Sequence, residues 1–198
     1  MPSQQVYLIR HGETEWSVSG QHTGITDIPL TENGRCVAKR LKPVLTKETF
    51  ALVLTSPLQR ARETCELAGL GRYAEIDRDL MEWNYGDYEG LTPQQIHAKN
   101  PGWMVFTDGC PGGESPEQVD ARIDRVIARV RAVEGHVALF GHGHVLRAFA
   151  PRWLGRRAAD GGHFLLDTAT LSILSDYRGI PAVKQWNAPL VPSGTAVS

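Results

Sequence analysis

Three short apolar runs, each followed directly by polar residues or glycine, constrain the fold of this chain more than any other feature. They cover residues 6–9, 51–54 and 137–140 and are too short for stable helices, which predicts buried strands of the parallel type. Residues 170–174 form a fourth candidate strand. Because helical patterns lie between these runs, we predict an α/β fold, a three-layer sandwich in which helices flank a mostly parallel sheet.

The segments between the strands carry helix signals at their ends and an apolar stripe along their length. We expect helices over residues 31–45, 57–68 and 116–134. Pro57 and Pro116 stand at expected first helical positions, which tolerate proline because the N–H group there is unpaired in any helix. Ser115 and Gln118 form a capping-box pattern, and Gly135 is the expected stop.

Residues 83–114 interrupt the alternation of strands and helices. The segment is rich in glycine, proline and aromatic residues, and only residues 93–99 predict a helix in it. We interpret the segment as a lid-like insertion over the functional site of a single domain that spans residues 1–198. The tail, residues 189–198, is expected to be loose.

Composition and charge exclude several classes of protein. The net charge is −1 and the isoelectric point is about 6.7, so the chain lacks the electrostatic footprint of a nucleic-acid partner. The apolar runs are far shorter than a membrane span, which predicts no membrane partner. The three cysteines are too few and too widely spaced for a disulfide framework or a zinc site. Together with the lack of a signal peptide, they indicate a cytoplasmic protein.

Polar side chains follow each of the first three strands. Arg10 and His11 come after the first, Arg60 lies just beyond the second, and His142 follows the third. Because ligands of open α/β sheets bind at the carboxyl ends of strands, we expect these side chains to meet at one edge. Arginine forks hold phosphate oxygens, a neutral histidine is a nucleophile, and a protonated second histidine stabilises charge on a transferring group. The sequence therefore predicts a phosphoryl-transfer site with no metal-binding pattern and no cofactor.

Four ordered sequence blocks resemble one known family. They are residues 8–14 (LIRHGET), 56–64 (SPLQRARET), 82–90 (EWNYGDYEG) and 141–143 (GHG). Together they are similar to the signature motifs of the histidine phosphatase superfamily, in its phosphoglycerate-mutase-like branch, and the match runs in order over roughly residues 6–150. Relatives are often dimers, so the resemblance implies a homodimer.

The resemblance also implies a role for each matching residue. It makes His11 the nucleophile that becomes phosphohistidine. It makes Glu82 the acid that protonates the leaving alcohol and then the base that activates water, with Glu75, Glu89 and Glu114 as nearby alternatives. The residues implied to bind the phosphoryl oxygens are Arg10, Arg60 and His142. Further contacts to the substrate are implied for Tyr85, for the backbone of Gly24 and Gly143, and for Ser17 and Thr23, which are equally compatible with ordinary loop positions.

The span that begins with the block at residues 82–90, which carries the implied acid and base Glu82, distinguishes the candidate functions. A phosphoglycerate mutase must hold a carboxylate and a second phosphate, for which its relatives carry an arginine pair and a lysine in this span. Here residues 83–121 contain one such cation, Lys99, and their aromatic, acidic and amide side chains suit a hydroxylated or apolar leaving group. The span also resembles bacterial acid phosphatases and sedoheptulose-bisphosphatase relatives, although a bisphosphate needs more cations than the sequence locates.

We therefore predict a phosphomonoesterase that hydrolyses small phosphate monoesters through a phosphohistidine on His11. Phosphoglycerate mutase is the alternative function. A catalytically inactive phosphate-binding module is a third candidate from another class, but such modules usually lose a nucleophile or an arginine. This chain keeps the complete set of expected site residues.

Overall fold

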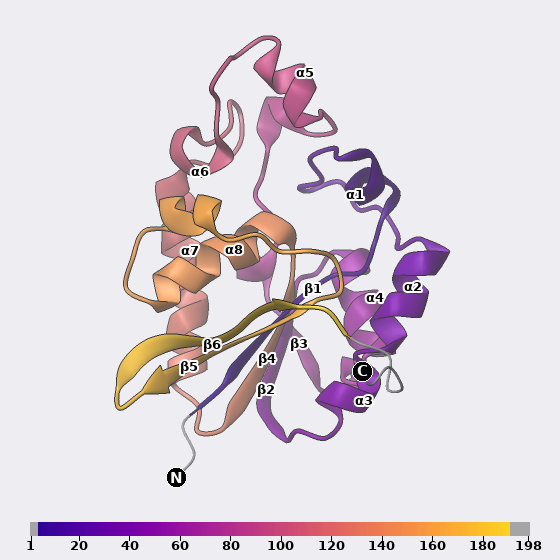
Figure 1. The fold of residues 1–198 in the computed structure, drawn as a ribbon, viewed down its shortest axis with the longest axis vertical. Helices are drawn as coiled ribbons and strands as arrows, with labels where there is room; N and C mark the ends of the chain where they lie inside the picture. The colour runs from indigo at the N-terminus through magenta and orange to yellow at the C-terminus, as the bar shows by residue number, and fades with distance from the viewer. Residues whose placement is uncertain (1–3, 191–198) are drawn as a thin grey trace, which may run out of the picture.

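The computed structural model describes residues 4–190, and these contain a six-stranded sheet in the order β3-β2-β4-β1-β5-β6 (Figure 1). Strands β3, β2, β4 and β1 are parallel, whereas β5 pairs antiparallel with both β1 and β6. The predicted α/β fold with a mostly parallel sheet is thus confirmed. The strands are β1 (Val6–Arg10), β2 (Phe50–Thr55), β3 (Ala74–Ile76), β4 (His136–Gly141), β5 (Leu171–Tyr177) and β6 (Ile180–Ala188).

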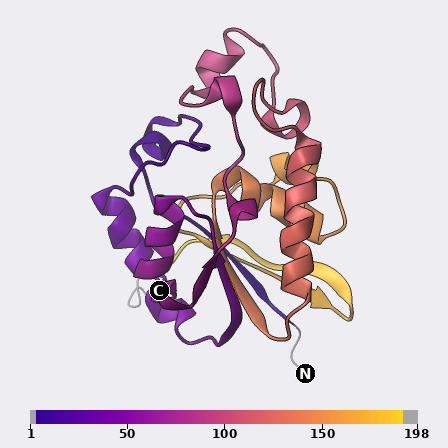
Figure 2. The same ribbon diagram turned by 180° about the vertical axis from the view of Figure 1, so that it is seen from behind.

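Helices cover both faces of the sheet and complete the three layers (Figures 1 and 2). Alternate residues of a strand point to opposite faces, so Leu8 and Leu139 are buried with α7 and α8, whereas Ile9 and Phe140 are buried with α3 and α4. The helices of the second face are α2 (Glu32–Lys39), α3 (Lys42–Leu45) and α4 (Gln59–Leu67), and those of the first are α7 (Pro116–Arg131) and α8 (Gly143–Trp153).

The sequence analysis misses the two strands at the edges of the sheet. β3 has only three residues, and none of them is fully buried. β6 contains Pro181 and Lys184 and has no buried face. Both lack the apolar run or alternation that marks a strand, because an edge strand is covered on fewer sides than a central one.

The helix expected over residues 31–45 is in fact two helices, α2 and α3. Thr31 caps α2 as its sequence position suggests, since its Oγ1 accepts the N–H of Gly34 at 2.9 Å. Pro43 lies in the first turn of α3, where its missing N–H costs nothing. The same proline could not continue α2, so the chain turns between the two helices.

Two other helix ends differ from the prediction. α4 begins at Gln59, because the residue after Pro57 is extended and donates its N–H to Ser56 Oγ at 3.3 Å. α7 begins with the predicted capping box but ends at Arg131 rather than just before Gly135. The N–H of the residue after Arg131 is shared between two carbonyl groups, which tightens and closes the last turn.

Residues 83–114 lie beyond the carboxyl ends of the central strands, together with α1 (Glu15–Ser19) (Figure 1). They contain α5 (Pro93–His97), which is expected, and α6 (Val105–Asp108), which is not, because four residues are too few for a periodic signal. Most of the tail at 189–198 lies outside the described residues. No helix within residues 4–190 is both long enough and apolar enough to cross a membrane. The short 3-10 helices are η1 (Gly71–Tyr73), η2 (Arg78–Leu80), η3 (Gly86–Tyr88) and η4 (Ala158–His163).

Candidate active site

The three loops of the predicted site begin side by side at the carboxyl edge of the sheet. The register of β1 and β4 sets Arg10 opposite Gly141. Beyond the strands, the N–H of His11 donates to the carbonyl of Gly141 at 3.0 Å, and the N–H of Ser56 donates to the carbonyl of Phe140 at 2.9 Å. These bonds hold the starts of the loops after β1, β2 and β4 at one level, as the sequence analysis expects.

His11 is almost completely buried, and its two ring nitrogens differ in their surroundings. Nδ1 lies 2.7 Å from the carbonyl oxygen of Gly12, and because a carbonyl only accepts, Nδ1 carries the proton. Burial, followed by the positive charges of Arg60 and Arg10, lowers the pKa of His11 well below 6.5. The ring is therefore neutral at pH 7 with its lone pair on Nε2, which is the form that acts as a nucleophile.

Arg60 is completely buried in the first turn of α4 and is surrounded by acceptors. Its Nη groups donate to the carbonyl oxygens of residues 23, 24 and 26 at 2.9–3.0 Å. Its Nε donates to Nδ1 of His142 at 3.1 Å. Four N–H groups of this guanidinium are thus engaged within residues 4–190, and Arg60 is a fixed positive charge beside His11.

His142 is a neutral imidazole in this arrangement. Because Nε of Arg60 can only donate, Nδ1 of His142 accepts, and Nε2 carries the proton toward Ser56 Oγ at 2.7 Å. Burial and the charge of Arg60 lower the pKa of His142 well below 6.5. Its ring centroid lies 5.1 Å from that of His11. The expectation of a protonated second histidine is therefore wrong, because the sequence does not reveal that Arg60 directs its Nε at this ring.

Glu82 is buried between η2 and the lid-like segment, and its carboxylate accepts three backbone N–H groups. Oε1 accepts from Trp83 at 2.9 Å and from Val145 at 2.8 Å, and Oε2 accepts from His144 at 2.9 Å. Two of these donors belong to the first turn of α8, where the helix dipole favours a carboxylate. Glu82 is thus anchored to the helix that follows His142.

The three alternative carboxylates are engaged elsewhere in the structure. Glu75 and Glu114 form ion pairs with arginines of α7, and Glu89 accepts two backbone N–H groups of residues 24 and 26. Of these four glutamates, all of which lie within the described residues, only Glu82 lines the cavity at the carboxyl edge. The preference for Glu82 over its neighbours therefore agrees with the geometry.

A cavity of about 230 Å³ lies at this edge. Gly143 sits between Arg10 and Glu82, since a Cβ atom on this glycine would be 3.3 Å from Cζ of Arg10 and 3.5 Å from Oε2 of Glu82. A cation, a carboxylate and the free Nε2 of His11 therefore face one space. The residues that line the cavity are Arg10, His11, Trp16, Ser17, Gly20, Gln21, His22, Thr23, Glu82, Tyr85, Pro93, Gly143, His144 and Arg147.

Ser17 and Tyr85 line the cavity with hydroxyl groups that already have partners. Ser17 Oγ donates to the carbonyl of Thr14 at 2.8 Å and accepts the N–H of Thr14 at 2.9 Å, which closes a capping box on α1. The hydroxyl of Tyr85 is hydrogen-bonded to Nδ1 of His144. Burial, followed by the charge of Glu82, raises the pKa of Tyr85 well above 10, so its hydroxyl keeps its proton.

Thr23 lines the cavity, whereas Gly24 is not among the described residues that line it. The N–H of Gly24 donates to Glu89 Oε1 at 2.9 Å, and its carbonyl accepts from Arg60. A Cβ atom at this position would lie only 2.6 Å from the carbonyl oxygen of Trp83, so a side chain has no space there. The structure therefore places Gly24 in the support of Arg60 and not at the expected substrate contact.

Arg147 is a cavity cation that the sequence analysis misses. Its Nε lies 3.3 Å from the carbonyl of Gly161, and its guanidinium carbon lies 4.7 Å from the centroid of the Phe106 ring. No carboxylate within residues 4–190 forms an ion pair with it. The signal that could have found it is spacing, since Arg147 lies four residues after Gly143 and so shares its face of α8.

Two histidines without an assigned role also line the cavity. The rings of His22 and His144 are stacked with centroids 5.8 Å apart, and Nδ1 of His22 donates to the carbonyl of Leu91 at 2.9 Å. Burial is the main cause that lowers the pKa of each. Although histidines gather here, no group of three His, Cys, Asp or Glu side chains in the described part of the chain is placed to hold a metal ion.

Comparison with known proteins identifies the family. Residues 6–189 match the model of the histidine phosphatase superfamily (branch 1). The chain therefore belongs to this superfamily, as its motifs indicate, and it is an enzyme that hydrolyses phosphate esters.

Individual relatives agree with this assignment. An acid phosphatase of Mycobacterium tuberculosis is 40% identical over 90% of this chain and 89% of its own length. A sedoheptulose 1,7-bisphosphatase of Saccharomyces cerevisiae is 36% identical over 78% and 70%, and a probable phosphoglycerate mutase of Photorhabdus laumondii is 32% identical over 89% and 86%. The solved structure of an open reading frame product from Mycobacterium tuberculosis superimposes with a TM-score of 0.91 at 36% identity, covering 95% of this chain and 99% of that one.

We predict that the buried histidines make the fold sensitive to mild acid. His11, His142 and His144 have lowered pKa values in the folded chain, whereas unfolding returns each to about 6.5. The unfolded state therefore binds more protons as the pH falls below about 7. The free energy of unfolding should fall by up to about 1.4 kcal/mol per pH unit for each such histidine. Urea titrations between pH 7.5 and 5.5 measure this slope.

The control for this prediction is a pair of glutamine variants. His144→Gln should reduce the slope, whereas His163→Gln, which removes an exposed histidine, should leave it unchanged. A free energy of unfolding that stays constant from pH 7.5 to 5.5 would contradict the assignment of neutral buried rings.

Proposed function

We propose that this chain hydrolyses small phosphate monoesters through a phosphohistidine on His11. One observation carries the proposal: the neutral ring of His11 has its lone pair on Nε2 and faces a cavity that also contains Arg10 and Glu82. A nucleophile, a cation for the phosphoryl oxygens and a proton donor are the groups that such a reaction requires.

In the first step, Nε2 of His11 attacks phosphorus and forms an N–P bond. The bond between phosphorus and the leaving oxygen breaks, and that oxygen receives the proton of Glu82. Arg10 binds the phosphoryl oxygens directly, because its guanidinium lines the cavity next to Gly143. Arg60 and His142 lie beside His11 and stabilise the group through a fixed charge and an oriented ring, since their hydrogen bonds are largely engaged within the protein.

In the second step, water attacks the phosphohistidine and gives a proton to Glu82, which restores the acid. The N–P bond breaks and inorganic phosphate leaves. Gly143 brings its backbone to the cavity with no side chain in the way, and Ser17 and Thr23 line the wall on the side of α1. Tyr85 lines the cavity close to the leaving group, where its ring provides an apolar surface.

Arg147 extends the proposal to the leaving group. It lies in the same cavity as Glu82, and its charge has no carboxylate partner among the described residues. We assign to it the binding of a second anionic group on the substrate, a carboxylate or a further phosphate. A bisphosphorylated substrate is therefore compatible with this cavity, because α8 supplies a cation that residues 83–121 lack.

Phosphoglycerate mutase stays the alternative function. A mutase has to hold a carboxylate and a second phosphate while both hydroxyl groups reach His11 in turn. Arg147 supplies one cation for these groups, and an unpaired anion in a closed site is costly. This favours hydrolysis. The retained nucleophile and acid in turn favour an enzyme over an inactive phosphate-binding module.

Two further assignments concern the location and the assembly of the chain. Cys36, Cys65 and Cys110 are all free thiols, which supports a reducing compartment, and on this ground we place the chain in the cytoplasm. The homodimer stays a prediction from the resemblance to the family.

The covalent intermediate is tested by trapping it. Native protein mixed with a radiolabelled phosphate monoester and quenched in alkali, where phosphohistidine survives, should carry label on the chain. His11→Ala should carry none and should lose activity by at least roughly 10³-fold, because the nitrogen that forms the N–P bond is removed. His163→Ala, an exposed substitution, is the control. Undiminished labelling of His11→Ala would overturn the mechanism.

Hydrolysis and mutase activity are separated by two assays on one preparation. The first measures release of inorganic phosphate from an aryl phosphate, and the second measures conversion of 3-phosphoglycerate to 2-phosphoglycerate with 2,3-bisphosphoglycerate supplied. We expect phosphate release without isomerisation. Robust isomerisation would instead identify a mutase in which Arg147 and other cations hold the second anion.

The role of Arg147 is tested by comparing substrates with and without a second anion. Arg147→Met should raise KM roughly 10- to 100-fold for a sugar bisphosphate, because a charge-assisted hydrogen bond is lost. The KM for an aryl phosphate with a neutral leaving group should change far less. Arg157→Met, which removes an exposed arginine on the surface, is the matched control. An equal change in both KM values would show that Arg147 does not discriminate between leaving groups.

A further inference from the structure

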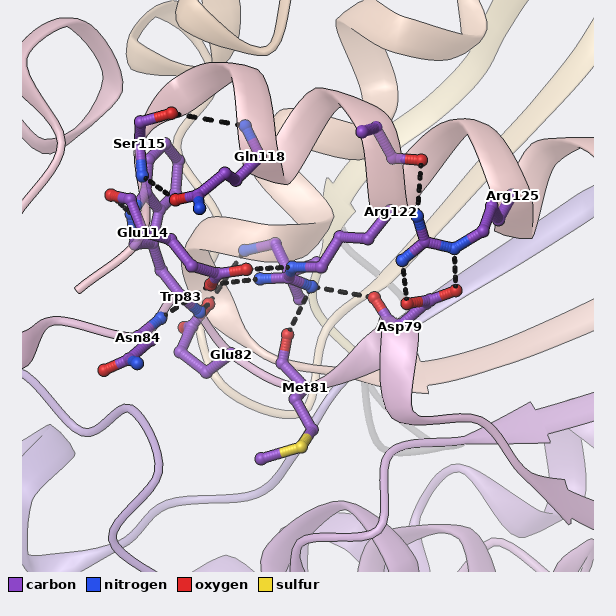
Figure 3. A network of polar contacts seen from close by, with 12 residues as sticks. Asp79, Met81, Glu82, Trp83, Asn84, Glu114, Ser115, Gln118, Arg122 and Arg125 are labelled. Atoms are coloured by element: carbon purple, nitrogen blue, oxygen red, sulfur yellow. Dashed lines mark hydrogen bonds and ion pairs between the residues drawn. The ribbon is translucent and has the colours of Figure 1, made fainter.

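A buried arginine that lies outside the cavity-lining set, Arg122, forms the centre of a polar network on α7 (Figure 3). Its Nε and one Nη donate to the two carboxylate oxygens of Glu114 at 2.8 and 3.1 Å. Its other Nη donates to the carbonyl oxygens of Asp79 and Met81 at 2.7 and 2.8 Å. A charge this deeply buried is retained only where such partners surround it.

Glu114 extends the network to the residues after Glu82. Its Oε2 also accepts the N–H of Asn84 at 2.8 Å, and its own N–H donates to the carbonyl of Asn84 at 2.9 Å. The indole N–H of Trp83 donates to the carbonyl of Glu114 at 3.0 Å. The pair of Arg122 and Glu114 therefore holds the chain immediately before Glu82, through Met81, and immediately after it.

The position of the Glu82 carboxylate thus depends on two anchors. α8 holds the carboxylate itself through backbone N–H groups. Arg122 on α7 and Glu114, two residues before this helix, hold the backbone on either side of Glu82, at Met81 and Asn84. The α8 bonds are made to oxygens that must also exchange a proton with the substrate. The bonds of Arg122 and Glu114 are not made to the reacting group, so proton transfer does not require them to break.

We propose that Arg122 and Glu114 are positioning residues that set Glu82 for proton transfer, an inference that rests on the proposed role of Glu82. Neither residue touches the cavity; both act through the backbone of residues 81–84. Proton transfer requires the donor and acceptor to meet at hydrogen-bond distance, and a displacement of about 1 Å costs roughly 10²-fold in rate. Loosening this pair should therefore weaken acid catalysis selectively.

The leaving group reports on acid catalysis. An alkoxide is a poor leaving group and needs a proton as the P–O bond breaks, whereas 2,4-dinitrophenolate leaves without one. The ratio of kcat/KM for an alkyl phosphate to kcat/KM for 2,4-dinitrophenyl phosphate therefore measures proton donation by Glu82. This ratio is independent of the concentration of active enzyme, so partial unfolding does not change it.

The experiment compares two variants with a matched control on the same helix. Arg122→Lys keeps the charge but cannot bridge a carboxylate and two carbonyl groups at once. Glu114→Gln replaces one carboxylate oxygen with an amide NH2 group, which cannot accept the N–H groups that Glu114 accepts. Arg125→Lys is the control, because the exposed Arg125 makes the same kind of fork to the carboxylate of Asp79 without reaching Glu82 (Figure 3). If Arg122→Lys does not fold, Glu114→Gln carries the test.

We expect the ratio to fall roughly 10- to 100-fold in Arg122→Lys and Glu114→Gln and to stay within about 2-fold of native in Arg125→Lys. Equal losses on both substrates would overturn the proposal and reduce the pair to a structural role. Glu82→Gln is measured in parallel. If it lowers the ratio while Arg122→Lys and Glu114→Gln leave the ratio unchanged, the positioning role is wrong and Glu82 remains the acid. If Glu82→Gln leaves the ratio unchanged, the assignment of Glu82 fails, and the positioning role fails with it.

Discussion

The parallel pairing of β1, β4 and β2 is the interaction on which the rest of this structure depends. Each ladder continues for one hydrogen bond past the end of a strand. Beyond β1 the N–H of His11 donates to the carbonyl of Gly141, and beyond β2 the N–H of Ser56 donates to the carbonyl of Phe140. This brings a nucleophilic ring, a serine and the start of α8 to one level. The strands are buried apolar residues with no chemistry of their own, and their registration converts distant segments of the chain into one site.

Two buried arginines, neither of which lines the cavity, then support the site, and both are stabilised in the same way. Arg60 is held by three carbonyl groups of the loop at residues 23–26, and Arg122 by two carbonyl groups and the carboxylate of Glu114. Each arginine therefore orders a backbone segment whose acceptors take up its N–H groups. The first keeps the surroundings of His11 positive, and the second fixes the segment that carries Glu82. Glu89 also fixes the loop at residues 23–26 around Arg60, because it accepts two backbone N–H groups of this loop.

The central strands and the convergence of Arg10, His11 and His142 could be predicted because short apolar runs and the residues after them are local signals. Other features depend on contacts that no local pattern encodes. The edge strand β6 has no buried face, and the neutral state of His142 follows from the direction of one N–H bond of Arg60. Arg147 belongs to none of the four sequence blocks and lies outside residues 83–121, and it reaches the cavity only because α8 begins at the carboxyl edge.

The outer strands of the sheet have a consequence for how the chain behaves among copies of itself. Any open sheet offers unpaired backbone groups along its two rims, and these can recruit a strand from another molecule. Here one rim is β3, which is three residues long, and the other is β6, which carries Pro181 and Lys184. A short rim gives little to pair with, and proline and lysine interrupt or repel an added strand. Both rims thus disfavour edge-to-edge aggregation at high concentration, while the catalytic edge lies across the ends of the strands and takes no part in this pairing.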